Sequence, residues 1–140
     1  MRKLLVPIDG STCSLRALAH AIRLATEASP TALCLVNVQQ APAPRAPGGL
    51  MNQAAREALQ QQGERDLADA RGLVDAAGLS YEVVVVFGEP GQTIARLARE
   101  HRCMGIVMGT RGLGEVAQVF LGSTAHEVLQ EADVPVTLVK

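Results

Sequence analysis

Short aliphatic runs alternate along the chain with longer segments in which apolar residues recur every three or four positions. The short runs predict buried strands at residues 3–8, 32–38, 81–87, 104–108 and 134–139. The periodic segments predict helices at about 14–28, 50–77 and 123–131. A further helix is expected to begin at Pro90 and to place on one face Ile94, Leu97, Ala98 and His101. Gly63 is expected to interrupt or bend the 50–77 helix, and Gly78 to end it.

Strands that alternate with helices predict βαβ units and an α/β fold with a parallel sheet. With 140 residues the chain has the size of one domain, and we expect residues 1–140 to form it. Ligands of such sheets bind beyond the carboxyl ends of the strands, where the strand order reverses. The segments after the first, second and fourth strands are therefore candidates. Residues 39–49 are rich in proline and glycine and are expected to form a long loop without fixed structure.

Composition and charge exclude several classes of function. Hydrophobic residues make up 48% of the chain but aromatic residues only 2%, which suits an aliphatic sheet buried on both faces. A net charge of -1 and the scarcity of aromatic stacking groups argue against nucleic-acid binding. No apolar stretch approaches the roughly 18 residues of a membrane helix. The apolar run at the N-terminus ends at Asp9, too early for a signal peptide, so we expect a cytoplasmic protein with no membrane partner.

A group of glycines follows the fourth predicted strand. Two residues separate Gly109 from Gly112, and nine separate Gly112 from Gly122, which precedes Ser123 and Thr124 at the start of the last helix. Glycines let backbone N–H groups approach an anion, and the N-terminus of a helix favours phosphate. Brought together, these turns would form a cradle for a polyphosphate.

The spacing G-x2-G-x9-G-[S/T] resembles the nucleotide loop of the ATP-binding universal stress proteins. Other segments are similar to the same family: residues 6–11 resemble its first strand and turn, 36–38 the end of its second strand, 88–90 its turn before the third helix, and 135–139 its last strand. The resemblance extends over nearly the whole chain. It implies a three-layer α/β sandwich of the adenine nucleotide alpha hydrolase-like type, with a five-stranded parallel sheet in the order 3-2-1-4-5.

The resemblance also implies a ligand and the residues that hold it. The ligand is ATP or another adenine nucleotide, with Mg²⁺ held mainly by phosphate oxygens. The base and ribose are expected near Asp9 and Val38, and the phosphates near the start of the last helix. The candidate nucleotide-binding residues are Pro7, Asp9, Val38, Met108, Gly109, Arg111, Gly112, Gly122, Ser123 and Thr124.

The last strand carries a second expectation. Proteins of this family usually pair their last strands across a twofold axis. Val134, Val136 and Leu138 alternate with the residues between them and would leave an apolar edge for a partner strand. A homodimer is therefore expected.

Each candidate residue also has a purely structural interpretation. Without a ligand the glycines are turns and Ser123 or Thr124 caps the last helix, with Thr124 and Glu127 matching a capping box. Asp9 then closes a turn through its side chain. Arg111 is, in this interpretation, a solvated side chain.

Other catalytic and metal motifs are not matched. The sequence lacks a Walker A lysine, and position 130 is glutamine where a zincin motif beginning at His126 needs histidine. His20, His101 and His126 fall on three different predicted helices and are expected to be isolated surface or helix-end residues. The cysteines are expected to act as small buried or half-buried hydrophobic residues: Cys13, Cys34 and Cys103.

Three functions remain open on the sequence alone. The first is an ATP-binding regulatory module of a stress response, in which nucleotide stabilises one conformation and so alters a partner surface. The second is an enzyme, either a slow ATPase or a nucleotidyl-transfer relative, although no general base can be named. The third is a dimeric interaction protein of the same fold that does not bind nucleotide.

Overall fold

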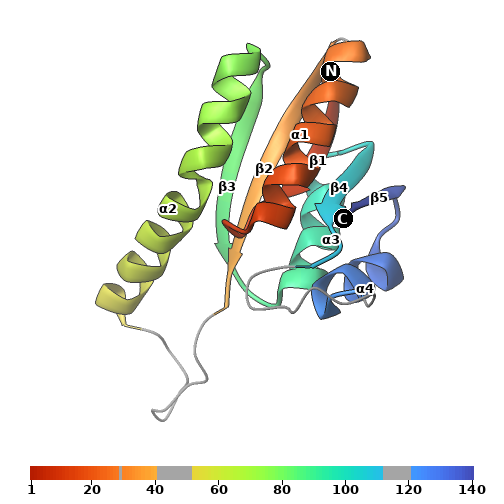
Figure 1. The fold of residues 1–140 in the computed structure, drawn as a ribbon. Helices are drawn as coiled ribbons and strands as arrows, with labels where there is room; N and C mark the ends of the chain where they lie inside the picture. The colour runs from red at the N-terminus through yellow and green to blue at the C-terminus, as the bar shows by residue number, and fades with distance from the viewer. Residues whose placement is uncertain (29, 41–51, 112–120) are drawn as a thin grey trace.

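The computed structural model describes residues 1–28, 30–40, 52–111 and 121–140. Strands and helices alternate throughout these residues (Figure 1). In chain order the elements are β1 (Arg2–Pro7), α1 (Thr12–Glu27), β2 (Thr31–Gln39), α2 (Gln53–Ala77), β3 (Tyr81–Phe87), α3 (Pro90–Glu100), β4 (Gly105–Gly109), α4 (Ser123–Glu131) and β5 (Val136–Val139). The predicted strands and helices are confirmed, with ends shifted by a few residues. Most of the expected loop at 39–49 lies outside the described residues.

The sheet is parallel throughout, and its five strands follow the order β3-β2-β1-β4-β5. The predicted α/β sandwich and its strand order are therefore confirmed. β1 lies at the centre, pairing with β2 on one side and with β4 on the other. Because the chain returns to the other side of β1 after β3, the strand order reverses between β1 and β4.

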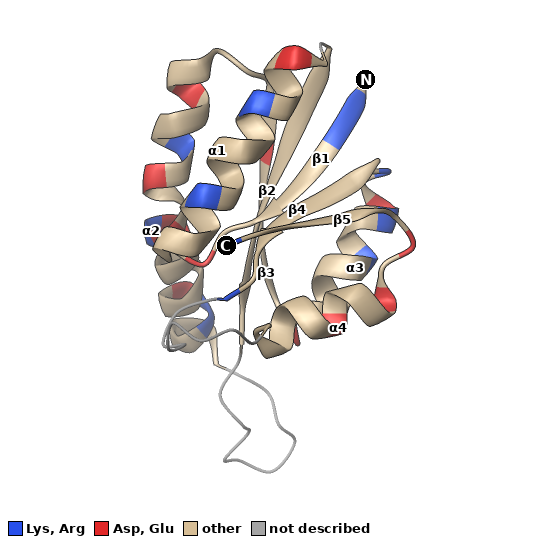
Figure 2. Ribbon diagram, turned by 45° about the vertical axis from the view of Figure 1, so that its right-hand side comes forward, with Lys and Arg blue, Asp and Glu red and all other residues tan. Residues whose placement is uncertain are grey.

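Helices cover both faces of the sheet and bury two separate cores (Figure 1). Successive strand residues point to opposite faces, so Leu4 and Val6 of β1 pack beneath α1 and α2, whereas Leu5 packs beneath α3 and α4. Aliphatic residues dominate both cores, as the composition predicts. Acidic and basic residues are mixed along α1 and α2 (Figure 2). Among the helices of the described residues, none has the length and apolar character that crossing a membrane requires.

Two of the three residues expected at a dimer interface lie in the edge strand β5, and the third, Val134, lies just before this strand. Val134, Val136 and Leu138 lie on one face and pack, half-buried, against the core beneath α3 and α4. Their side chains are therefore partly used inside the chain. What β5 leaves open is its backbone edge, because it is the last strand in the sheet.

Gly63 does not interrupt its helix, contrary to one part of the expectation. α2 runs without a break from Gln53 to Ala77 and ends at Gly78 in the left-handed conformation, as predicted. Gly63 is buried against the sheet, and a Cβ there would lie 2.6 Å from Cγ1 of Val85 and 2.9 Å from Oδ1 of Asn37. The glycine is needed because the helix passes very close to β2 and β3.

We predict that Gly63→Ala destabilises the protein by about 1–3 kcal/mol, the usual cost of overfilling a packed core. Gly72→Ala in the same helix is the matched control, since nothing lies within 4 Å of a Cβ at that position. The control should gain about 0.5–1 kcal/mol from helix propensity. Denaturant melts measure both, and equal effects of the two substitutions would contradict the close-packing explanation.

Candidate functional site

A cavity of about 270 Å³ opens beyond the carboxyl ends of β1, β2 and β4. It lies where the strand order reverses, the position at which α/β sheets bind ligands. The first turns of α1, α3 and α4 also reach it, through Ser14, Pro90 and Thr124. Its volume is close to the lower limit of roughly 300 Å³ for small-molecule pockets.

Most of the sequence-predicted site residues come together around this cavity. Its lining includes Pro7, Asp9, Val38, Met108, Gly109, Arg111, Gly122 and Thr124. Ser123 does not line it and is exposed at the first position of α4. Gly112 lies outside the described residues. These residues lie in or directly after β1, β2 and β4 and at the start of α4, so the fold gathers residues that are up to 117 positions apart in sequence (Pro7 and Thr124).

The start of α4 differs from the capping interpretation. The N-cap is Gly122 itself, with an extended backbone (φ −65°, ψ 157°), and no side chain of the described residues caps the helix. Ser123 and Thr124 lie inside the helix, one and two residues past the cap, so the Thr124–Glu127 capping box does not form. The amide of Gly122 donates to the carbonyl oxygen of Thr110 at 2.7 Å. The next amides of the first turn lack an intrahelical acceptor by helix geometry.

The start of α1 is satisfied within the chain. The Ser11 hydroxyl accepts from the Ser14 amide at 3.1 Å and caps the helix. The Asp9 carboxylate accepts from the Ser11 amide at 2.9 Å, which is the turn expected from the sequence. Asp9 therefore has a structural role, and it also lines the cavity.

Gly109 has a structural reason to be glycine. A Cβ at this position would lie 2.7 Å from Sγ of Cys13 and 3.2 Å from the carbonyl carbon and oxygen of the same residue. The end of β4 thus passes directly against the start of α1. Gly109 lines the cavity as well, but its lack of a side chain follows from this contact without any ligand.

The cavity has an apolar part and a polar part. Its apolar lining includes Val38, Ile94 and Met108, which suits a flat ring such as a base. Among the described lining residues, Asp9 and Arg111 carry the charges. Opposite charges at one opening can orient a polar ligand.

Several lining residues were not predicted. They are Ile8, Ser14, Val36, Gln40, Pro90, Ile94, Thr110 and Ala125. Thr110 could have been predicted, because it lies between Gly109 and Arg111, which are both predicted site residues. Pro90 and Ile94 belong to α3, which packs against α4 and β2. The turn at 88–90 marked the start of this helix in the sequence, but it did not place the helix at the cavity.

His101 lies at a helix end, as expected, but it is not isolated from other potential ligands. It caps the end of α3, and its Nδ1 lies 2.9 Å from Oε1 of Glu82 on β3. Lys3 of β1 reaches the same oxygen at 3.2 Å. Although partial burial opposes ionisation, hydrogen bonds from His101 and Lys3 hold the pKa of Glu82 below its usual value. The cysteines are all buried and unbridged, in agreement with the prediction.

The order of the sheet and the cavity at its switch point define a doubly wound α/β protein with a ligand-sized site. The model of the universal stress protein family matches residues 1–140, and the chain belongs to this family. Universal stress protein MJ0531 of Methanocaldococcus jannaschii is 30% identical over 139 residues, covering 99% of this chain and 82% of that relative. A universal stress protein of Thermus aquaticus is 32% identical over 139 residues, covering 99% and 98%.

Solved structures share the fold. The structure of MJ0577 superposes with a TM-score of 0.84 at 22% identity, over 99% of this chain and 95% of that one. A universal stress protein in complex with cAMP gives a TM-score of 0.75 at 25% identity, over 99% and 97%. Others of this fold contain dAMP, in the protein of Archaeoglobus fulgidus, or AMP, in a protein of Arabidopsis thaliana. Adenine nucleotides are therefore ligands of several structures similar to this one.

We predict that Gly109→Ala lowers the stability of the ligand-free protein by about 1–3 kcal/mol, because the new methyl group overlaps Cys13. Cys13→Ala removes the Sγ atom that makes the closest contact, at 2.7 Å. The double variant should therefore lose less stability than the sum of the two single variants. A double-mutant cycle from denaturant melts measures this coupling, and additive losses would show that the contact does not limit position 109.

Proposed function

We propose that the cavity binds an adenine nucleotide, and that the protein acts as a nucleotide-responsive regulatory module of a stress response. The observation that carries this proposal is the start of α4. Thr124 and Ala125 of its first turn line the cavity, and no described side chain caps the amides of this turn. The positive end of a helix dipole and free N–H groups favour an anion there.

The rest of the cavity fits the other parts of a nucleotide. The apolar lining from Val38, Ile94 and Met108 would contact the base, and Asp9 would accept hydrogen bonds from ribose hydroxyls. Arg111 would offset phosphate charge. The adenine nucleotides in similar structures support this class of ligand. The preferred ligand in the proposal is ATP with Mg²⁺, which phosphate oxygens would hold.

The proposal favours binding over catalysis. Asp9 is the carboxylate among the described lining residues, and it already accepts from the Ser11 amide. No second carboxylate or histidine of the described residues lines the cavity to act as a general base. Nucleotide would then work by stabilising one arrangement of α4, which leads directly into the edge strand β5.

The edge of β5 supports a second part of the proposal, a homodimer through the last strand. The amides of Ile106 and Thr110 donate to the carbonyl oxygens of Pro135 and Val139. In a parallel pair this pattern turns the N–H and C=O groups of Val136 and Leu138 away from β4. A second copy of β5 would satisfy these groups.

We predict that Gly122→Asp weakens nucleotide binding without unfolding the protein. The extended backbone of Gly122 suits an N-cap, so the new carboxylate would accept from the first-turn amides of α4 and occupy the place of the phosphates. Calorimetric titration with Mg·ATP should show at least about a tenfold loss of affinity, equivalent to about 1.4 kcal/mol, while the melting temperature stays equal or rises.

Gly122→Asn is the matched control, because asparagine caps a helix equally well but adds no charge. It should weaken ATP binding less than Gly122→Asp does. If the Gly122→Asp variant binds ATP as tightly as the wild type does, the phosphates do not bind at the start of α4. If the wild-type protein binds no ATP at millimolar concentration, a dimeric interaction protein without nucleotide binding becomes the better hypothesis.

We predict that light scattering at micromolar concentration gives the mass of two 14.7 kDa chains. Leu138→Pro should yield a monomer, because proline removes an N–H that points away from β4 and costs no hydrogen bond within the sheet. A circular dichroism melt checks that this variant remains folded. A monomeric wild type, or a dimer that survives Leu138→Pro, would be incompatible with pairing through β5.

A further inference from the structure

A second group of polar side chains lies at the other end of the sheet from the cavity. We name Cys34, Glu82, His101 and Cys103 the amino-end cluster. Cys34 stands four residues before Val38 on β2, roughly 13 Å along an extended strand. β2 and β3 begin at the top of Figure 1, whereas the cavity lies beyond their opposite ends. The proposed nucleotide site therefore makes no use of this cluster.

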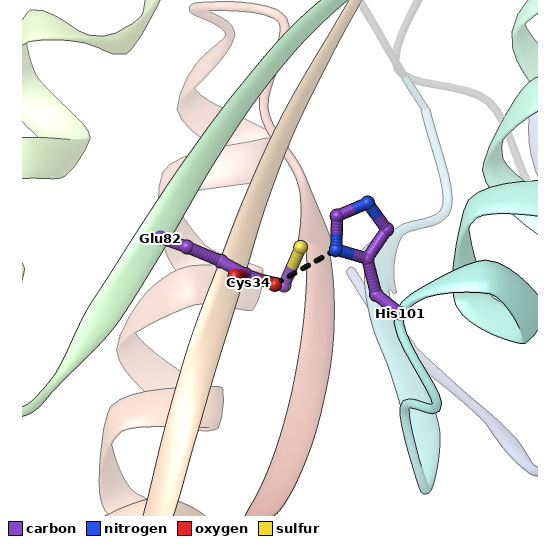
Figure 3. Close-up of side chains that lie close together, drawn as sticks. All are labelled: Cys34, Glu82 and His101. Atoms are coloured by element: carbon purple, nitrogen blue, oxygen red, sulfur yellow. Dashed lines mark hydrogen bonds and ion pairs between the residues drawn. The ribbon is translucent and has the colours of Figure 1, made fainter.

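Three elements bring the cluster together. The register pairs Cys34 directly with Glu82, so both side chains lie on the face beneath α3 and α4. His101 points toward them from the end of α3 (Figure 3). The Cys34 sulfur, a Glu82 carboxylate oxygen and a His101 ring nitrogen all lie within 4.8 Å of one another. Ligands of a tetrahedral zinc ion are about 3.3–3.8 Å apart, given bonds of about 2.0–2.3 Å, so small side-chain movements suffice.

A fourth donor follows His101 in the chain. Cys103 is buried in the same core as Cys34, beneath α3 and α4. Its sulfur is not one of the three donor atoms that already lie within 4.8 Å of one another, so Cys103 would have to move toward the ion. The backbone between His101 and Cys103 turns through Arg102, which has a left-handed φ of 55°. The amides of Arg102 and Cys103 donate to the carbonyl oxygens of Arg99 and Ala98, which is a Schellman turn built without glycine. Arg102 thus separates His101 from Cys103 in this strained turn. The turn places both residues on the side of the sheet that carries Cys34.

We infer that the amino-end cluster is a zinc site with Cys34, Cys103, His101 and Glu82 as its ligands. Two sulfurs, one imidazole nitrogen and one carboxylate oxygen are donors that Zn²⁺ takes in proteins. Cys34 is fully buried, whereas the side chains of His101 and Glu82 are 27% and 40% exposed, which gives the ion a path from solvent.

The charges of the cluster balance for a divalent ion. Two thiolates and the Glu82 carboxylate contribute three negative charges, while Zn²⁺ and the Lys3 ammonium, which lies 3.2 Å from Glu82, contribute three positive charges. His101 would donate its Nδ1 lone pair and carry its proton on Nε2.

The site is tested by titrating metal-free full-length protein with Zn²⁺ against a chromophoric chelator, without nucleotide. We expect one zinc ion per chain with a dissociation constant below about 1 µM. His101→Ala should weaken binding at least about tenfold. His20→Ala is the matched control, a half-buried histidine on α1 outside the cluster, and it should bind zinc like the wild type.

Cobalt reports on the sulfur ligands. Co²⁺-loaded wild type should show thiolate-to-metal charge-transfer absorption, which Cys34→Ser or Cys103→Ser reduces and Cys13→Ser retains. Gly122→Asp should bind zinc normally, since the cluster lies at the other end of the sheet. Absence of zinc binding by the folded wild type would overturn the inference, as would equal affinities of the His101→Ala and wild-type proteins.

Discussion

The central position of β1 is the constraint on which the rest of the structure depends. β1 pairs with β2 and with β4, so the chain must build one half of the sheet, cross back and build the other half. The connection after β1 leads to α1 on one face, whereas α4, reached after β4, lies on the opposite face. Because these two connections leave the sheet toward opposite faces, a space remains between them at the carboxyl ends of β1 and β4. The cavity is the result of that divergence, and its lining is drawn from both halves of the chain.

Close approach between layers is the second general feature. Ala17 and Ala21 of α1 are fully buried, and Gly63 and Gly109 occupy positions where a methyl group would overlap a neighbour. With few aromatic residues in the chain, mostly small and aliphatic side chains lie between the helices and the sheet. At Gly63 and Gly109 the backbones of neighbouring elements therefore lie close together.

The sequence predicted the fold well because its signals are local. Aliphatic runs and periodic segments mark the elements, and the glycine spacing marks the loops that meet at the cavity. Residues such as Ile94 and Gln40 were missed since they reach the cavity through helix packing and strand length, not through a motif. His101 was misjudged for a similar reason: Glu82 and Cys34 lie 19 and 67 residues away in the chain, and only the register of β2 with β3 brings them beside it. The wrong expectation that Gly63 interrupts its helix came from treating glycine as a helix breaker when its role is steric.

The start of α4, which no side chain of the described residues caps, has a consequence for the energetics of the whole domain. A helix of nine residues is too short to persist alone, and this one forgoes the roughly 1 kcal/mol that a capping side chain supplies. Its order then rests on packing against α3 and, if the proposed function holds, on the anion bound at its first turn. The segment that touches the ligand would accordingly be among the first to open by local unfolding. A ligand in the cavity would lengthen the time for which α4 stays folded. The edge strand β5, which follows α4, would then be more rigid as well.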